Sequence, residues 1–406
     1  MASQRIGEHE QPKTKIKPWH RVKALASPLN HTKLTIIPMR ADLIANEFSL
    51  PGQAAAVRPF GAGNINETYL ALFRDGTIEH PAIIQKIRQN VFPQPAIVMQ
   101  NLRVLSEHLQ KNLEAEADQA DRPWIFPEII PTKAGEDFIA EPNGDIWRAL
   151  TFIPGAQTFE TVQGPEHAFE VGLVLGHFHR QVEALPSAQF NVALPGFHDA
   201  AQYLAQFKSV LQTETAESLI KASPSTRKAV EFIQSRQGPL LLLSEAFAQG
   251  KLKLSVTHGD PKAGNVMIEN ETGRGIGLID LDTVQAGLRE HDFGDAARSL
   301  CNPAGESPAK LGDVELDLEL LKAFINGYKI EVDRMSQRPT EAFYYEAILG
   351  MTLELGLRFL ADHLAGDRYF KVQQPGHNLY RAQAQFNLAE SIEKQEPLIR
   401  ELIQDL

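Results

Sequence analysis

The sequence predicts a two-lobed α+β protein in which a small antiparallel-sheet lobe precedes a larger, mainly helical lobe. Short β-prone runs divided by turn residues fill the first part of the chain, and apolar residues recur at helical spacing after Pro154. The chain has 406 residues, and a single hydrophobic core usually divides beyond roughly 250–300 residues. We therefore expect a polar leader at 1–35, an N-terminal lobe at 36–152 and a C-terminal lobe at 153–406.

The N-terminal lobe contains five runs with the length and composition of strands. The turn signals Arg-Asp-Gly at 74–76 and Asn-Gly-Asp at 143–145 predict hairpins among them. One helix is expected to pack on this sheet, because Ile97, Leu102 and Leu105 recur at helical spacing. The five expected strands are residues 57–60, 68–73, 81–87, 136–141 and 146–153.

The C-terminal lobe is expected to be mainly helical, with short strands around residues 252–280. Phe152 and Ile153 would then form the connector between the lobes. A cleft between two lobes is where small ligands most often bind, so the connector is expected to line a ligand site. The expected helices are residues 165–185, 197–214, 225–248, 313–332, 340–365 and 377–403.

Composition argues against several classes of protein. The formal net charge is −11, whereas nucleic-acid binding needs clustered Lys and Arg to neutralise phosphates. No run approaches the roughly 20 apolar residues of a membrane span. Cys301 is the single cysteine, which excludes an internal disulfide and fits a reducing, cytoplasmic compartment. We expect no nucleic-acid or membrane partner, and the sequence leaves the oligomeric state open.

The residues that carry chemistry lie in His-Gly-Asp-Pro-Lys-Ala-Gly-Asn at 258–265 and at the end of the apolar run 275–280. Phosphoryl transfer needs a carboxylate beside the acceptor hydroxyl and oxygen ligands for a magnesium ion. Asp260 can orient the hydroxyl and take its proton, and Lys262 can contact the transferred phosphate. Asn265 and Asp280 can bind magnesium. Either segment alone is common at ordinary turns, but together they favour catalysis.

A second triplet, Asp292-Phe293-Gly294, has the letters of a kinase magnesium motif but not its setting. It lies 27 residues after Asn265 and follows a polar segment, whereas Asp280 closes an apolar strand. That strand is expected to pair with residues 266–270 across a turn. We therefore do not assign the metal to this triplet. The family resemblance given below implies a structural role for Asp292, or alternatively Asp295, which is to bind the backbone of the catalytic loop.

A glycine-containing loop, Gly61-Ala62-Gly63-Asn64, lies between two expected strands. Glycines let a backbone approach phosphates closely, and Asn66 and Thr68 can add side-chain donors. A glycine pair is also a common hairpin turn, so the loop gains weight only from the catalytic segments. It is neither a Walker A loop nor a Rossmann loop, because no Gly-Lys-Ser/Thr follows and the next element is a strand.

Residues 258–265 and Ile-Asp-Leu-Asp at 279–282 resemble the aminoglycoside phosphotransferase and choline kinase superfamily. With GNINETYL, IIQKIRQNVFP, RFLADHLAGDRYF and HNL, the chain is similar over roughly residues 57–403 to bacterial N-acetylhexosamine 1-kinases. The resemblance implies a bilobal protein-kinase-like fold. It also implies ATP- and Mg²⁺-dependent phosphorylation of the anomeric hydroxyl of an N-acetylated hexose, a small-molecule sugar.

Further nucleotide contacts are expected beyond Gly61, Gly63, Asn66 and Thr68. Phe152 and Ile153 are expected to contact ATP, because they form the connector beside the cleft. The resemblance adds a position on the third strand. Gln85 stands where the family has a phosphate-binding lysine. Lys86 is the other candidate, and strand alternation allows only one of the two to face the nucleotide. Glu107 on the following helix is a doubtful partner for an ion pair.

The resemblance also places Arg358 and Tyr369 at the acceptor, together with Asp260, and Asp282 is a further candidate because it lies near the strand that ends at Asp280. Other roles stay open, because Arg358 could pair with Asp362 one helical turn later and Tyr369 could cover the core. Two alternative functions stay open as well. One is a kinase for a cationic alcohol of the choline or aminoglycoside type, which needs an acidic acceptor pocket. The other is a non-catalytic nucleotide-binding protein, which should lack Asp260, Asn265 or Asp280.

Overall fold

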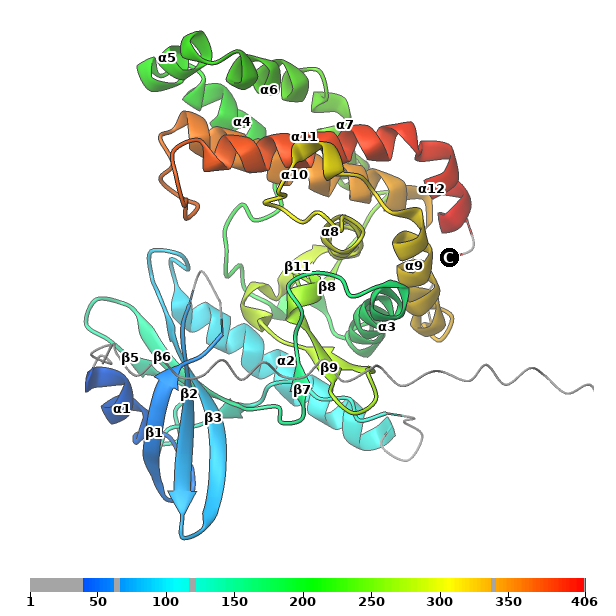
Figure 1. Cartoon of the computed structure of the whole chain (residues 1–406). Helices are drawn as coiled ribbons and strands as arrows, with labels where there is room; N and C mark the ends of the chain where they lie inside the picture. Colours follow the sequence, from blue (N-terminus) through cyan, green and yellow to red (C-terminus); the bar gives the residue numbers. More distant parts are fainter. Residues whose placement is uncertain (1–38, 62–65, 117–121, 337–340, 405) are drawn as a thin grey trace, which may run out of the picture.

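The computed structural model describes residues 39–61, 66–116, 122–336, 341–404 and 406 (Figure 1). The expected leader at 1–35 and Gly63 lie outside the described residues. Two lobes are visible, a sheet with two helices and a larger body in which helices predominate. Among the described residues, no helix is long and apolar enough to cross a lipid bilayer.

The N-terminal lobe is an antiparallel sheet with the order β1-β2-β3-β6-β4, and β5 pairs with β6. Helix α1 (Met39–Ala45) packs on one face with Tyr69 and Trp147. Helix α2 (Pro95–Glu116) packs on the other face with Ile87 and Leu150. The strands are β1 (Gln53–Pro59), β2 (Glu67–Asp75), β3 (Ile78–Ile87), β4 (Ile129–Ile130), β5 (Ile139–Ala140) and β6 (Ile146–Thr151).

The C-terminal lobe begins with the short strand β7 (Ala156–Gln157), and two small antiparallel sheets bring its loops to the cleft. One has the order β10-β9-β7 and the other pairs β11 with β8. The strands are β8 (Leu254–Thr257), β9 (Val266–Glu269), β10 (Gly275–Leu278) and β11 (Gln285–Leu288). The helices are α3 (Pro165–Gln181), α4 (Ala200–Val210), α5 (Glu214–Ala222), α6 (Pro224–Gln234), α7 (Gln237–Ala248), α8 (Arg289–Leu300), α9 (Leu318–Val332), α10 (Tyr344–Leu364), α11 (His377–Lys394) and α12 (Glu396–Ile403).

Four expectations about the helices differ from the structure. The helix expected at 225–248 is two helices, α6 and α7, and the one expected at 377–403 divides at Gln395 into α11 and α12. Pro397 lies in the first turn of α12, where its missing N–H costs no hydrogen bond. Helix α5 was not expected, and neither was helix α8. The apolar residues of α8 recur at helical spacing, but buried Asp and Glu side chains lie among them.

Helices α3 and α9 pack backbone to backbone through glycines. A Cβ on Gly172 would lie 2.0 Å from the carbonyl oxygen of Phe324, and a Cβ on Gly327 would lie 2.0 Å from that of Phe169. A methyl group therefore does not fit at either position unless the helices separate. This contact fixes α9 against α3, which also carries His179 towards the catalytic loop.

We expect Gly172→Ala to lower the free energy of unfolding by about 1–3 kcal/mol, because overpacking a closely packed contact costs that much. Thermal melting followed by circular dichroism measures the loss. The matched control is Gly350→Ala in α10, where the nearest atom to an added Cβ is 3.9 Å away. That control should hold or raise the melting temperature, since alanine favours a helix over glycine. Equal melting temperatures for both variants would contradict the predicted contact.

Candidate active site

The catalytic loop at 258–265 leaves β8 and is held by a carboxylate from α8. Oδ2 of Asp292 accepts a hydrogen bond from the His258 N–H at 2.7 Å, and Oδ1 accepts one from the Gly259 N–H at 2.8 Å. His179 Nε2 lies 3.0 Å from the same carboxylate. Although burial acts to raise it, the hydrogen bonds from His179 and Gly259 hold the pKa of Asp292 below its ordinary value. The prediction that Asp292 binds the catalytic-loop backbone is confirmed.

Within this loop, Asp260, Lys262 and Asn265 converge. Lys262 Nζ lies 2.7 Å from Asp260 Oδ2, and Asn265 Nδ2 donates to the Asp260 carbonyl at 2.7 Å and to Oδ2 at 3.3 Å. Partial burial acts to lower the pKa of Lys262, but the Asp260 carboxylate raises it above its ordinary value. Lys262 is therefore charged at neutral pH and fixed beside Asp260.

Asp280 reaches the catalytic loop from a second loop. The expected pairing of β9 with β10 is confirmed, and β10 ends at Leu278. Asp280 has φ 62° and ψ 53°, a left-handed conformation that Asp adopts more readily than most residues. The Ile279 N–H donates to the Asn265 carbonyl at 2.9 Å, and its carbonyl lies 3.0 Å from His258 Nε2. These bonds tie the two loops together.

The charges around Asp280 fit a magnesium ion. Asp280 is exposed to solvent, yet protein atoms crowd its carboxylate closely enough to desolvate it in part. This desolvation, followed by the charges of Asp282 and Asp260, raises the pKa of Asp280 above its ordinary value. A divalent cation would relieve such crowding. No group of three or more His, Cys, Asp or Glu side chains could hold a metal in the described part of the chain. Magnesium needs only one or two protein carboxylates, since phosphates and waters complete its shell.

One face of the N-terminal sheet turns Thr68, Gln85 and Arg148 towards this site. Thr68 pairs with Gln85 across β2 and β3, and Gln85 pairs with Arg148 across β3 and β6. Gln85 Nε2 donates to Thr68 Oγ1 at 3.1 Å, and Arg148 Nε and Nη2 donate to Gln85 Oε1 at 3.0 and 2.7 Å. Sequence reasoning missed Arg148, although a charged residue inside the apolar run Ile-Trp-Arg-Ala-Leu was a signal.

Asp282 lies beside this group. Its Oδ1 lies 2.5 Å from Arg148 Nη2, and its Oδ2 accepts a hydrogen bond from Asn66 Nδ2 at 2.6 Å. Both oxygens therefore contact residues of the N-terminal lobe, and the side chain is 3% exposed. Apart from the ion pair with Arg148, Oδ1 has no hydrogen-bond partner among the described residues, so the expectation that Asp282 contacts the acceptor stays a prediction.

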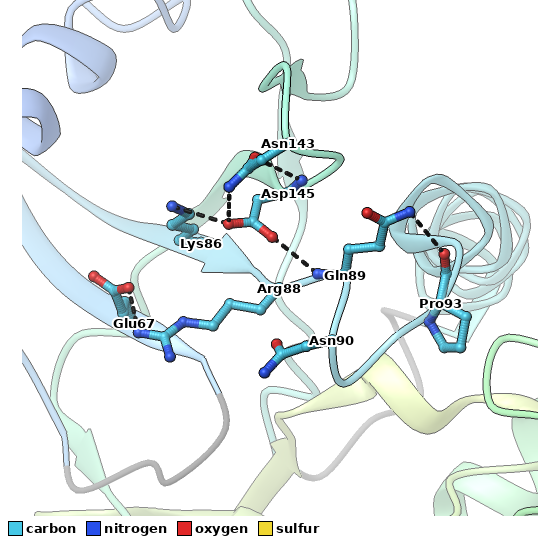
Figure 2. A pocket seen from close by; sticks show the side chains of 8 residues that line it. All are labelled: Glu67, Lys86, Arg88, Gln89, Asn90, Pro93, Asn143 and Asp145. Atoms are coloured by element: carbon cyan, nitrogen blue, oxygen red, sulfur yellow. Dashed lines mark hydrogen bonds and ion pairs between the residues drawn. The ribbon is translucent and has the colours of Figure 1, made fainter.

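Lys86 lies on the opposite face of the sheet. Its Nζ pairs with Asp145 Oδ2 at 3.0 Å (Figure 2). It also pairs with Glu141 Oε2 at 3.2 Å. With Glu67, Arg88, Gln89, Asn90, Pro93, Asn143 and Asp145 it lines a polar cavity of about 680 Å³. Of the two candidates on β3, Gln85 therefore faces the cleft, and Lys86 does not join the residues expected to bind the nucleotide. Glu107 is exposed on α2 and is no partner for Gln85.

The connector between the lobes is apolar, as a segment that contacts the adenine base of a nucleotide would need to be. Phe152 and Ile153 lie between β6 and β7, and Ile153 packs with Met267 of β9 and Ile276 of β10. The ring of Phe152 meets the ring of Phe60 edge to face at 5.9 Å, and Gly61 follows with φ 77°. An added Cβ on Gly61 would meet no atom within 4 Å, so this loop borders open space. Phe60 and Met267 were not among the predicted residues.

Arg358 and Tyr369 lie in the helical lobe. The Arg358 guanidinium lies 5.8, 5.0 and 5.6 Å from the ring centres of Phe197, Tyr203 and Phe370. Tyr369 is 64% exposed, so it does not cover the core.

The alternative pairing of Arg358 with Asp362 is not the arrangement found. The carboxylate of Asp362 instead accepts the backbone N–H groups of Arg368, Tyr369 and Phe370 at 2.8, 2.8 and 2.9 Å. These bonds fix the loop that presents Tyr369 to solvent after α10.

Comparison with known proteins agrees with the two-lobed fold described above. The phosphotransferase enzyme family matches residues 56–329. A microcompartment-associated aminopropanol kinase superposes with a TM-score of 0.57 at 18% identity, covering 88% of this chain and 98% of that one. An aminoglycoside phosphotransferase from Alicyclobacillus acidocaldarius gives 0.56 at 14%, covering 93% and 99%. Choline kinase from Cryptosporidium parvum gives 0.51 at 16%, covering 86% and 91%. At these identities the likeness shows a shared fold.

Proposed function

Because the chain belongs to the phosphotransferase enzyme family, we propose that it transfers the γ-phosphoryl group of ATP to the anomeric C1 hydroxyl of an N-acetylhexosamine or related hexose. Phosphoryl transfer to an alcohol follows from the family, and the sugar acceptor is the proposal's finer part. The observation that supports phosphoryl transfer is the convergence of three residues of the catalytic loop, Asp260, Lys262 and Asn265, with Asp280 from a separate loop.

The geometry supports a direct transfer. Asp260 orients the acceptor hydroxyl and takes its proton as the acceptor oxygen bonds to the γ-phosphorus and the bond to the ADP oxygen breaks. Lys262, charged and fixed by Asp260, offsets the charge on the transferred phosphoryl group. Asn265 and Asp280 are the residues that would hold a magnesium ion, which would supply further positive charge for the phosphates.

The charges near the catalytic loop favour a neutral acceptor over a cationic one. Three carboxylates near the catalytic loop that could attract a cation already have partners. Asp295 pairs with Arg298 at 2.7 Å, Glu354 pairs with His198 at 2.9 Å, and Glu306 pairs with Arg298 and Arg381 at 3.4 and 2.9 Å. A pocket for choline or an aminoglycoside needs carboxylates without such partners.

The aromatic rings around Arg358 support the same conclusion. Quaternary ammonium groups are commonly bound inside a cage of aromatic faces. Here the rings of Phe197, Tyr203 and Phe370 surround the guanidinium of Arg358 instead. A cationic acceptor would meet a positive charge where it needs an empty cage, whereas sugar hydroxyls can accept hydrogen bonds from Arg358.

A screen of acceptors tests the proposal. ADP release is measured with ATP and Mg²⁺ over free hexoses, N-acetylhexosamines, choline, an aminopropanol and aminoglycosides, and phosphorus NMR locates the new ester. We expect turnover with an N-acetylhexosamine and a phosphate on C1. The Asp260→Asn protein serves as the control for background hydrolysis of ATP. Turnover with cationic alcohols alone would replace the sugar assignment by the alternative, and no turnover with any acceptor would contradict the catalytic assignment.

A further inference from the structure

We infer that Arg148 on β6 is the cation that binds the nucleotide phosphates from the N-terminal lobe, with Asp282 as its counter-charge. The inference rests on the proposed ATP-dependent function and deepens it. Kinase sites of this general kind use a lysine on the third strand, paired with a glutamate on the following helix. Here the third strand offers no lysine on the cleft face, so the charge has to come from elsewhere.

The sheet register places Arg148 beside the position where that lysine would stand. Gln85 is the cleft-facing residue on β3, and Arg148 is directly opposite it on β6. Gln85 carries no charge, but its Oε1 accepts two hydrogen bonds from the Arg148 guanidinium, at 3.0 and 2.7 Å. Gln85 in turn donates to Thr68 at the start of β2. The Gln85 amide therefore orients the neighbouring Arg148 guanidinium.

The carboxylate that balances the charge of Arg148 also comes from a different element than the helix after the third strand. Glu107 on α2 is exposed and takes no part. Asp282 supplies the carboxylate from the turn that follows β10, and its Oδ1 lies 2.5 Å from Arg148 Nη2. Since Asp282 is two residues from Asp280, the pair joins the N-terminal sheet to the loop assigned to magnesium. Arg148 therefore sits where phosphates bound by Asp280 through a metal ion would also meet the sheet.

Burial argues for a functional role of this pair. The side chains of Arg148 and Asp282 are 2% and 3% exposed. A buried ion pair is weak evidence for stability, because desolvation of both groups offsets much of their attraction. A guanidinium has five N–H groups in a planar fork, and Gln85 and Asp282 use only Nε and Nη2. Nη1 donates to the sulfur of Met99 at 4.0 Å, which is a weak acceptor. Nη1 is therefore the nitrogen whose N–H groups can be offered to a phosphate oxygen.

Calorimetry without any acceptor tests this inference. The dissociation constants of MgATP and of adenosine are measured for the wild type, Arg148→Gln and the double variant Arg148→Gln with Gln85→Lys. We expect Arg148→Gln to lower the preference for MgATP over adenosine at least about tenfold, because it removes charge-assisted hydrogen bonds to phosphate. The double variant should regain part of that preference, since it returns a cation to the third strand. Lys86→Gln, on the other face, is the control and should match the wild type.

Adenosine separates phosphate binding from general damage to the fold. A preference for MgATP that is unchanged in Arg148→Gln overturns the inference. If that variant does not fold, Arg148→Lys decides the matter, because an ammonium lacks the planar fork by which the guanidinium holds Gln85 and Asp282 through Nε and Nη2 and still offers Nη1 to a phosphate. Its preference should fall at least threefold, and an unchanged value again overturns the inference. A wild type that binds MgATP no better than adenosine would instead contradict the proposed function itself.

Discussion

Replacing Asp260 with asparagine is expected to lower kcat by about 10²–10⁴-fold, the usual contribution of a general base. The amide cannot take the proton of the acceptor hydroxyl. It is otherwise nearly the same shape, and the hydrogen bond from Asn265 to the backbone carbonyl of residue 260 survives. The loop is also held by Asp292 through His258 and Gly259, which the substitution does not touch. Nucleotide affinity should therefore change little.

Steady-state kinetics with the acceptor found in the screen, and calorimetry with MgATP, check both halves of this expectation. Asp313→Asn is the matched control, because it makes the same chemical change at an exposed carboxylate of the same lobe. That control should retain wild-type kcat. Near-normal turnover by Asp260→Asn would contradict the assignment, and a parallel loss of MgATP binding would indicate that Asp260 acts on the nucleotide rather than on the acceptor.

The catalytic loop could be predicted because its chemistry lies within a few residues of chain. Asp260, Lys262 and Asn265 share one loop, and the apolar run before Asp280 marked a second strand end. The hairpin of β9 and β10 then brings the two segments together, as the turn between them suggested. Short-range geometry of this kind follows from strand alternation and turn residues alone.

The N-terminal side of the site could be predicted only in part. Alternation showed that Gln85 and Lys86 face opposite ways, but it could not show which face meets the cleft. That choice depends on α1 packing on the face of Lys86 and α2 on the other. The pair of Arg148 with Asp282 joins positions far apart in the sequence, and no local pattern reports such a contact.

Helix α8 shows a further limit of hydrophobic patterns. It has apolar residues at helical spacing between Phe293 and Leu300, but it also buries Asp292, Asp295 and Arg298, so the segment as a whole is polar. The charges are tolerated because each has a partner, such as the Asp292 contacts with the catalytic loop and the pair of Asp295 with Arg298. A search for hydrophobic patterns therefore interprets this segment as a loop, although its buried charged residues belong to a helix that holds the catalytic loop.

Asp280→Asn is expected to remove most of the magnesium dependence of ATP binding. Asparagine keeps an oxygen and tolerates the left-handed backbone at φ 62°, which alanine would not. What it loses is the anionic ligand, and magnesium binds carboxylates in preference to neutral amides in such sites. The variant also removes one of three neighbouring carboxylates, Asp260, Asp280 and Asp282, whose mutual repulsion raises the pKa of Asp280. The melting temperature of the free protein should therefore not fall.

Titrations of ATP with magnesium and with EDTA separate these effects. In the wild type, magnesium should strengthen ATP binding at least about tenfold, or about 1.4 kcal/mol, and in Asp280→Asn the two titrations should converge. Asp313→Asn again serves as the control and should keep the wild-type difference. A variant whose ATP affinity still depends on magnesium as in the wild type would place the metal elsewhere. A lower melting temperature of Asp280→Asn would mean that the Asp280 carboxylate stabilises the turn. Its repulsion by the neighbouring carboxylates would then not be the larger effect on stability.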